Sequence, residues 1–307
     1  MKEARSIAVL FTCVCMTLAH AQHTPLTTQY LFNGLTINPA YAGARDALTA
    51  NLMHRQQWVG FAGAPVTQTM SVHAPLDKSK LGLGLLLYSD GMGVSRETGV
   101  FGNVAYRMKL PHGRLGLGLG VGATMVRGAW NEVALQDQSD VVFAAPTRSA
   151  LRPNFSTGAF YYNKRAFIGL SAPFLLTHRV RWTSDGYSMS EVQGDLEPML
   201  TAGRVFDLNK DLKLKPSFLA RYRTATGAQA DLTATAIYKE RISLGASYRT
   251  NDAVIAMLEV QPTPQWRIGY AYDMGLNSLR AHHLGSHEIF LQYELGFRIR
   301  ARDPRYF

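Results

Sequence analysis

The sequence LKLKPSFLARYR, residues 212–223, alternates between two kinds of side chain and decides the fold. In an extended strand, successive side chains point to opposite faces. One face then carries Leu212, Leu214, Pro216, Phe218, Ala220 and Tyr222. The opposite face carries Lys213, Lys215, Ser217, Leu219, Arg221 and Arg223, of which five are polar and four of those are cations. One face of this strand therefore needs water and the other does not.

The same alternation recurs along the chain, in runs that are long for a soluble protein. Further runs lie at residues 98–110, 229–238, 242–249, 265–273 and 286–300. Several of them reach the roughly 9 to 11 residues that a tilted membrane strand needs, whereas strands of soluble sheets average about 5 to 6. Charged residues make up 18% of the chain, below the roughly 25% usual for soluble domains. We therefore predict an all-β fold, a transmembrane antiparallel β-barrel of about 14 strands between residues 47 and 300.

Glycines occupy one whole face of another alternating run, at residues 115–125. The leucines Leu115, Leu117 and Leu119 share one face of this run, and Gly116, Gly118, Gly120 and Gly122 share the other. A face without side chains costs some strand stability, and it leaves room for curvature or for a plug inside the barrel.

The lengths of the connections predict how the barrel is oriented. Residues 111–113 and 209–211 are short and turn-like, whereas residues 130–153 and 174–197 form long connections. Short turns are typical of the periplasmic side of such barrels and long loops of the external side. An even number of strands also places both termini on the periplasmic side.

The first residues have the three parts of a secretory signal peptide. Lys2 and Arg5 precede an apolar stretch at residues 7–18, and Ala19-His20-Ala21 forms a small-x-small cleavage site. We expect a signal peptide at residues 1–21, an N-terminal periplasmic or plug-like segment outside the barrel wall at 22–46, the barrel at 47–300 and a C-terminal tail at 301–307. Both cysteines of the chain lie in this leader, so the mature protein would have no disulfide. Export and a barrel together predict the outer membrane.

Three groups of residues resemble the motifs of one known family. Gln29-Tyr30 with Asn33, followed by Asn38-Pro39-Ala40-Tyr41-Ala42-Gly43, is similar to the opening motif of the PorP/SprF family of type IX secretion system membrane proteins. Gln57-Trp58-Val59-Gly60-Phe61 with Gly63-Ala64-Pro65 is similar to its second motif. Gly269-Tyr270-Ala271-Tyr272-Asp273 and Ser286-His287-Glu288-Ile289 are similar to its closing motif. The motifs stand in the family's order and span almost the whole predicted mature chain.

The resemblance implies an outer-membrane component of the type IX machinery, which exports proteins with a conserved C-terminal domain and serves gliding motility. It implies partners among the periplasmic ring and peptidoglycan-binding components, or among the C-terminal domains of secreted adhesins, and it implies no enzymatic activity and no cofactor. The alternative is an outer-membrane channel or transporter for small or hydrophobic solutes, because the same barrel could leave an open lumen.

The motif residues admit a structural reading beside the functional one. Gly43, Gly60, Gly63 and Pro65 fit positions that only fix turn dihedrals where strands begin. The N-terminal segment is polar and alternates too little to be a strand. We therefore expect it to fold against or into the barrel, and we assign the motif residues Asn38, Tyr41, Gln57 and Trp58 to this contact.

Catalytic, metal and nucleotide sites find little support in the sequence. Ser286, His287 and Glu288 are adjacent in a strand, so the histidine points away from the other two and no catalytic relay can form among them. We expect Glu288 to pair inside the lumen with a cation such as Arg249 or Arg267. The loop histidines His282 and His283 should splay apart, and no helix follows Gly118-Leu119-Gly120 to bind a pyrophosphate.

The chain has a formal net charge of +10, but we do not interpret this charge as a nucleic-acid-binding surface. In an exported barrel, cations line the lumen or lie near anionic outer-membrane lipid and lipopolysaccharide. Arg298, Arg300, Arg302 and Arg305 would form a basic tail on the periplasmic side.

Overall fold

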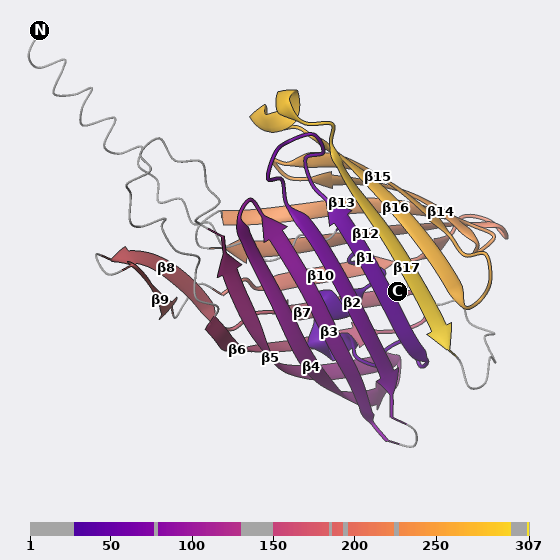
Figure 1. Cartoon of the computed structure of the whole chain (residues 1–307). Coiled ribbons are helices and arrows are strands. Elements are labelled where there is room, and N and C mark those ends of the chain that lie inside the picture. Colours follow the sequence, from indigo (N-terminus) through magenta and orange to yellow (C-terminus); the bar gives the residue numbers. More distant parts are fainter. Residues whose placement is uncertain are drawn as a thin grey trace, which may run out of the picture.

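The computed structural model describes residues 28–76, 79–129, 150–183, 186–192, 196–223, 227–295 and 306, and it describes the backbone alone at residue 150 and residues 177–192. Within these residues, 14 antiparallel strands close into a barrel (Figure 1). The barrel strands are β1 (Leu48–Gln56), β2 (Val66–Pro75), β3 (Leu81–Met92), β4 (Ser95–Leu110), β5 (Gly113–Gly128), β6 (Ala150–Tyr162), β7 (Ala166–Ala172), β10 (Met199–Arg204), β12 (Leu212–Arg223), β13 (Gly227–Tyr238), β14 (Ile242–Arg249), β15 (Ala253–Val260), β16 (Trp266–Gly275) and β17 (Ser286–Leu295).

Each barrel strand has a hydrogen-bonded neighbour on both sides. Most neighbours are consecutive in the chain, β10 pairs with β7 on one side and β12 on the other, and β1 pairs with β17 to close the wall. The two-residue strand β11 (Phe206–Asp207) lies beside β12, and β8 (Thr177–Thr183) with β9 (Gly186–Val192) forms a separate hairpin. The predicted fold class and strand number are confirmed, and the stretch at residues 212–223 is β12 from its first residue to its last.

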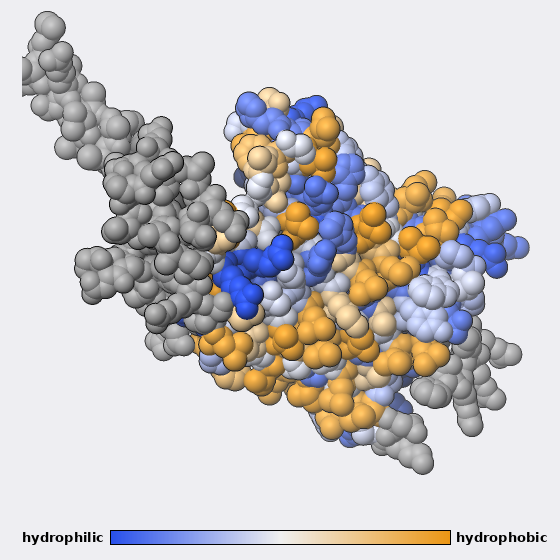
Figure 2. All heavy atoms as spheres, viewed as in Figure 1, coloured by the Kyte–Doolittle hydropathy of each residue, from blue (hydrophilic) through white to orange (hydrophobic). Residues whose placement is uncertain are grey.

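The alternation in β12 separates a lipid-facing surface from the lumen. Lys215, Ser217 and Arg221 point inward and are buried, whereas Tyr222 on the other face is 52% exposed. Apolar side chains on the outer face of the other strands are exposed in the same way, and Figure 2 shows hydrophobic residues gathered over the strand wall. Such a surface can face lipid at no cost in free energy, because hydrocarbon solvates apolar side chains and the closed sheet pairs the hydrogen-bonding groups of the backbone. In the described part of the chain, no helix is long and apolar enough to span a membrane.

The two ends of the barrel differ in their connections. The four longest connections, residues 57–65, 129–149, 173–198 and 276–285, all lie at one end, which we call the long-loop end. The opposite, short-turn end holds the start of β1, the end of β17 and connections such as residues 111–112 and 163–165. The predicted long connection at 174–197 contains the β8–β9 hairpin, and most of the one at 130–153 lies outside the described residues.

Candidate functional site

Residues 28–46 form a segment, here called the plug, that runs through the lumen and contains two short 3-10 turns, η1 (Gly34–Thr36) and η2 (Pro39–Tyr41). Every plug residue is buried except Thr36 and Asp46. Its chain is the indigo coil enclosed by the strands in Figure 1, and it contacts opposite walls of the barrel. Its first residue, Thr28, lies against β17, whereas Asn38 lies against β6 and β7. The plug therefore occupies the interior that the sequence left open for water or for a plug.

Asn38 both caps η2 and fastens it to the wall. Its side-chain oxygen accepts a hydrogen bond from the backbone N–H of Ala40 at 2.9 Å, and Pro39 follows at the first helical position. An Asn cap followed by Pro is a favoured way to begin a helical turn. The Asn38 amide also donates to the carbonyl oxygens of Ala159 at 3.0 Å and Leu170 at 3.4 Å. One side chain thus fixes both the local shape of the plug and its position in the barrel.

Lumen-facing glycines leave the space into which the plug packs. A Cβ atom on Gly118 would lie 2.1 Å from the backbone nitrogen of Ala40, and one on Gly82 would lie 2.1 Å from the carbonyl oxygen of Ala42. Both obstacles are backbone atoms, so no rotamer change removes the clash. Gly116 meets the plug backbone in the same way, and a Cβ on Gly158 would lie 2.2 Å from the Asn38 side-chain oxygen. These four glycines, Gly82, Gly116, Gly118 and Gly158, are here called the glycine cradle. The bare glycine face is therefore explained by the plug.

Tyr41 and Gly43 complete the docking of the opening motif. The Tyr41 ring packs edge-on against His73 and Phe160, each with 5.3 Å between ring centroids. Gly43 has φ of +73°, a left-handed conformation that favours glycine. Its N–H donates to Nδ1 of His73 at 3.3 Å, and its carbonyl accepts from Arg107 at 2.7 Å. Gly43 therefore serves a turn and also contacts the barrel wall.

Asn33 adds a polar contact between the plug and the first two strands. Its side-chain oxygen accepts a hydrogen bond from Ser71 on β2 at 2.8 Å, and Ser71 in turn accepts from Asn51 on β1 at 3.1 Å. All three side chains are buried.

A buried ion cluster holds the first residue of the plug at the long-loop end. Arg55 reaches the Asp273 carboxylate at 2.7 Å and the Glu288 carboxylate at 3.2 Å. The backbone N–H groups of Thr28 and Gln29 each donate to Glu288 at 2.8 Å. Charged hydrogen bonds of this kind are about twice as strong as neutral ones. The Glu288 carboxylate therefore binds the wall and the plug together.

The expected partners of Glu288 were wrong, although its place in the lumen was right. Arg249 pairs instead with Asp231 at 2.9 Å, and Arg267 pairs with Glu259 at 3.0 Å. The reason is the closure of the barrel, because β1 lies beside β17 and its register sets Arg55 directly opposite Glu288. Residues so distant in the chain become neighbours only when the sheet closes.

A second buried pair fixes the far end of the plug. Arg45 pairs with Glu294 near the end of β17, and the two side chains are 1% and 13% exposed. The plug is thus held by opposite charges at both ends of the lumen.

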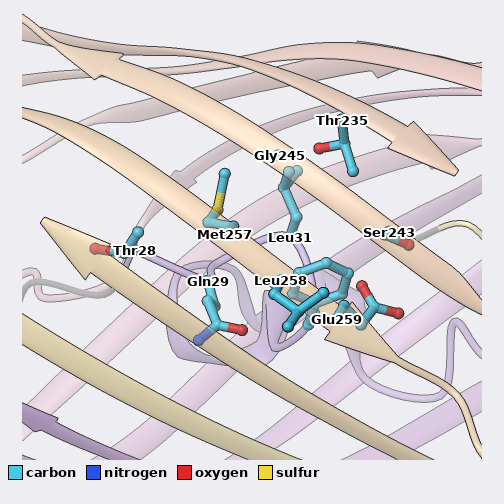
Figure 3. Close-up of a pocket in the computed structure, with 10 residues that line it drawn as sticks. Thr28, Gln29, Leu31, Thr235, Ser243, Gly245, Met257, Leu258 and Glu259 are labelled. Carbon is cyan, nitrogen blue, oxygen red and sulfur yellow. The ribbon is translucent and has the colours of Figure 1, made fainter.

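Little open space remains between the plug and the wall. One cavity, shown in Figure 3, lies between Thr28, Gln29 and Leu31 of the plug and residues of β13, β14 and β15. Its volume is about 10 Å³, room for about one water molecule. A cavity of this size does not pass a solute. In the described part of the chain, no group of three or more His, Asp and Glu side chains is placed to hold a metal ion.

A family model matches residues 19–293, which is most of the chain, and its description is "Type IX secretion system membrane protein PorP/SprF". This chain belongs to the PorP/SprF family. It is accordingly an outer-membrane β-barrel of type IX secretion. Short turns are typical of the periplasmic side of such barrels and long loops of the external side, so the short-turn end is called the periplasmic end from here on and the long-loop end the surface end.

Several solved outer-membrane proteins are similar to this chain at low sequence identity. The CymD monoaromatic hydrocarbon channel is 12% identical with a TM-score of 0.49, over 88% of this chain and 93% of that chain. A Pseudomonas aeruginosa FadL homologue is 12% identical with a TM-score of 0.47, over 89% and 95%. Omp33 of Acinetobacter baumannii is 8% identical with a TM-score of 0.47, over 81% and 99%. No curated protein matches the chain by sequence.

The second PorP/SprF motif meets the start of the last strand, which carries part of the closing motif, at the long-loop end. Val59 and the segment at Leu284 and Gly285 exchange two backbone hydrogen bonds of 2.8 Å, and Trp58 N–H donates to the Ser286 hydroxyl at 3.2 Å. Gln57 N–H donates to the Pro65 carbonyl at 2.9 Å, which closes the loop between β1 and β2. Gln57 and Trp58 therefore join two surface loops and do not extend the plug.

The loop glycines have the backbone role that the structural reading expected. Gly60 and Gly63 have φ of +91° and +72°, and nothing lies within 4 Å of a Cβ built on Gly60. His287 points outward, where its ring meets the Tyr270 hydroxyl at 2.6 Å, whereas Ser286 and Glu288 point inward. The three adjacent residues are thus divided between the faces as predicted.

Several residues that hold the plug carried no motif and were not singled out from the sequence. Arg55 and Glu294 belong to alternating strands, and Gly82 and Gly158 lie on faces that only the closed barrel brings together. The available signal was the alternation, which assigns Arg55 and Glu288 to the lumen but does not say which lumen groups meet.

Exposed cations gather around the periplasmic end of this PorP/SprF protein. Partly or fully exposed side chains there include eleven Lys and Arg against five Asp and Glu, whereas the surface end has five against three among the residues described. The fully exposed cations, here called the cationic rim, are Lys80, Lys109, Lys164, Arg165, Arg204, Lys210, Lys239 and Arg241. Four of the acids are already paired, Asp46 with Arg114, Asp207 with Arg165, Glu240 with Lys213 and Glu294 with Arg45. The predicted basic tail at residues 298–305 lies outside the described residues.

Proposed function

We propose that this PorP/SprF barrel acts by protein–protein contact within the type IX machinery, and that it neither conducts solutes nor catalyses a reaction. The observation that carries the proposal is the plug, which fills the lumen and is bonded to the wall at both ends. A conducting barrel needs a continuous water path, and the cavity beside the plug has room for about one water molecule. What remains for interaction is the two ends of the barrel.

We assign the periplasmic contact to the cationic rim. Its cations stand on or beside short connections that the barrel holds in place, so little backbone freedom is lost when a partner binds. A matching partner would present an acidic surface, because complementary charge steers association and excludes wrong partners. The periplasmic ring and peptidoglycan-binding components of the type IX system are the candidates on this side, and secreted adhesin C-terminal domains are the candidates at the surface end.

A charge-reversal experiment separates these assignments. The variant Lys109→Glu, Lys210→Glu, Arg241→Glu changes three rim cations, none of which is in a salt bridge within the described structure. Its matched control, Arg96→Glu, Arg127→Glu, Arg280→Glu, makes the same change at the surface end. Both proteins are captured from native membranes under mild detergent, and the co-purified proteins are identified.

We expect the rim variant to retain at least about tenfold less of the periplasmic components than the control, since tenfold corresponds to about 1.4 kcal/mol. Loss of a surface adhesin from the control alone would assign the contact to the other end. Equal capture by both variants and the wild type would refute a rim contact. If the rim cations bind only anionic lipid, the rim variant will capture the same proteins as the wild type but will bind less to vesicles that contain anionic phospholipid.

Conductance distinguishes the proposal from the channel alternative. Purified wild-type protein in a planar bilayer should show no steady ion current, because the plug leaves no continuous water path. Steady current at low voltage would favour the channel and refute the closed barrel.

A further inference from the structure

The direction in which the plug runs places its two ends at opposite sides of the membrane. Thr28 is bonded to Glu288 and Asp273, and these residues lie next to the strand ends at the surface side of β17 and β16. At the other end of the plug, Arg45 is bonded to Glu294, one residue before the end of β17 at the periplasmic side. The chain therefore runs from the surface end to the periplasmic end before β1 begins.

We propose that the mature N-terminus of this protein is displayed at the cell surface, with the plug threaded through the barrel from outside to inside. The proposal rests on the fixed position of Thr28 and on the reach of the chain before it. Only six residues, 22–27, precede Thr28 when Gln22 is the first residue of the mature chain, and six residues span at most about 22 Å when fully extended. The apolar band of such a barrel is about 25 Å tall.

The path back to the periplasm is also blocked. Residues 29–45 already occupy the lumen, and nearly all of them are buried against the wall. A second strand of chain would have to share the lumen with these residues, and the cavity beside Thr28, Gln29 and Leu31 has room for about one water molecule. The residues before Thr28 thus have one exit, the mouth between the surface loops.

Thr28 is held firmly enough to define this exit. Its N–H donates to Glu288 at 2.8 Å, and its hydroxyl accepts from Arg55 at 2.8 Å and donates to Asp273 at 3.1 Å. Arg249 adds a contact at 3.4 Å to the same hydroxyl. Thr28 is 4% exposed, so this cluster forms a buried collar around the chain where it enters the barrel.

Cysteine labelling on intact cells tests the topology directly. Cys13 and Cys15 are the only cysteines and precede Gln22, so a single introduced cysteine is the one thiol of the mature protein. Thr24→Cys is the test variant. Leu284→Cys, at a surface-loop position that is 72% exposed, is the positive control, and Lys210→Cys, in a periplasmic turn, is the negative control. The probe is a bulky maleimide that does not cross the outer membrane.

We expect Thr24→Cys to react on intact cells to the same extent as Leu284→Cys, while Lys210→Cys reacts only after the outer membrane is permeabilised. Labelling of Thr24→Cys only after permeabilisation would place the N-terminus in the periplasm and overturn the proposal. Labelling only in urea would show that these residues stay inside the barrel, which also overturns it. Neither result depends on the partner capture or on the conductance, so the proposed function stands or falls separately.

Discussion

Replacing Gly118 by alanine should loosen the plug. The added Cβ would lie 2.1 Å from the backbone nitrogen of Ala40 and 2.4 Å from its Cα. Ordinary van der Waals contact begins at about 3.4 Å, so the η2 turn would have to move by about 1.3 Å. The obstacle is backbone, and no side chain can rotate to relieve it.

The magnitude follows from what this movement disrupts. Overpacking of a well-packed interior costs about 1–3 kcal/mol. A shift of about 1.3 Å also lengthens the Asn38 hydrogen bonds, now 3.0 and 3.4 Å, beyond bonding distance, at about 1 kcal/mol each. Alanine in a strand regains up to about 1 kcal/mol relative to glycine. The net penalty on the docked plug is about 2–4 kcal/mol, which multiplies the undocked fraction by about thirty to several hundred.

Planar-bilayer recording and urea unfolding in lipid vesicles measure this effect. Gly118→Ala should show transient current steps that the wild type lacks, and it should unfold at lower urea. The matched control is Gly102→Ala, on the outer face of β4, where a built Cβ meets only the Val121 carbonyl at 3.8 Å. If Gly118→Ala were as silent and as stable as Gly102→Ala, the packing of the plug against the glycine cradle would be refuted.

Two other substitutions test the polar contacts of the plug. Glu288→Gln keeps the shape but leaves Arg55 without its full counter-charge, so we expect a loss of about 3–5 kcal/mol in unfolding free energy, against under about 1 kcal/mol for the exposed Glu240→Gln; equal midpoints in urea would contradict the buried pair. Asn38→Ala removes the cap of η2 and two wall contacts, and a loss of about 1–3 kcal/mol should follow. We expect proteases to cleave residues 28–46 faster in this variant while the amount of folded barrel stays the same. Unchanged cleavage would show that Asn38 does not hold the plug.

The barrel wall could be predicted from the sequence because a membrane strand faces two different solvents. Lipid on one side and a polar lumen on the other impose an alternation that is visible at each residue of β12, and the predicted run there matches the strand. The bare face of β5 could be recognised for the same reason, since four glycines in alternate positions leave a row with no side chains.

The contacts inside the barrel could not be predicted in the same way. Which lumen groups meet depends on the closure between β1 and β17, and that register sets Arg55 opposite Glu288. No local pattern near either residue encodes it, which is why Arg249 and Arg267 were the wrong partners. Trp58 shows a related limit, because the motif marks it as special while its place at the surface loops depends on the segment at Gly285 and Ser286.

Hydrogen exchange of the N-terminal segment, measured by mass spectrometry on the protein in lipid nanodiscs, tests the closed lumen most directly. Amides of residues 28–46 should be protected about as long as those of the strands that enclose them, since exchange would require the plug to leave the barrel. Exchange of these amides within seconds, as in an unstructured tail, would show that the lumen is open and would contradict the account.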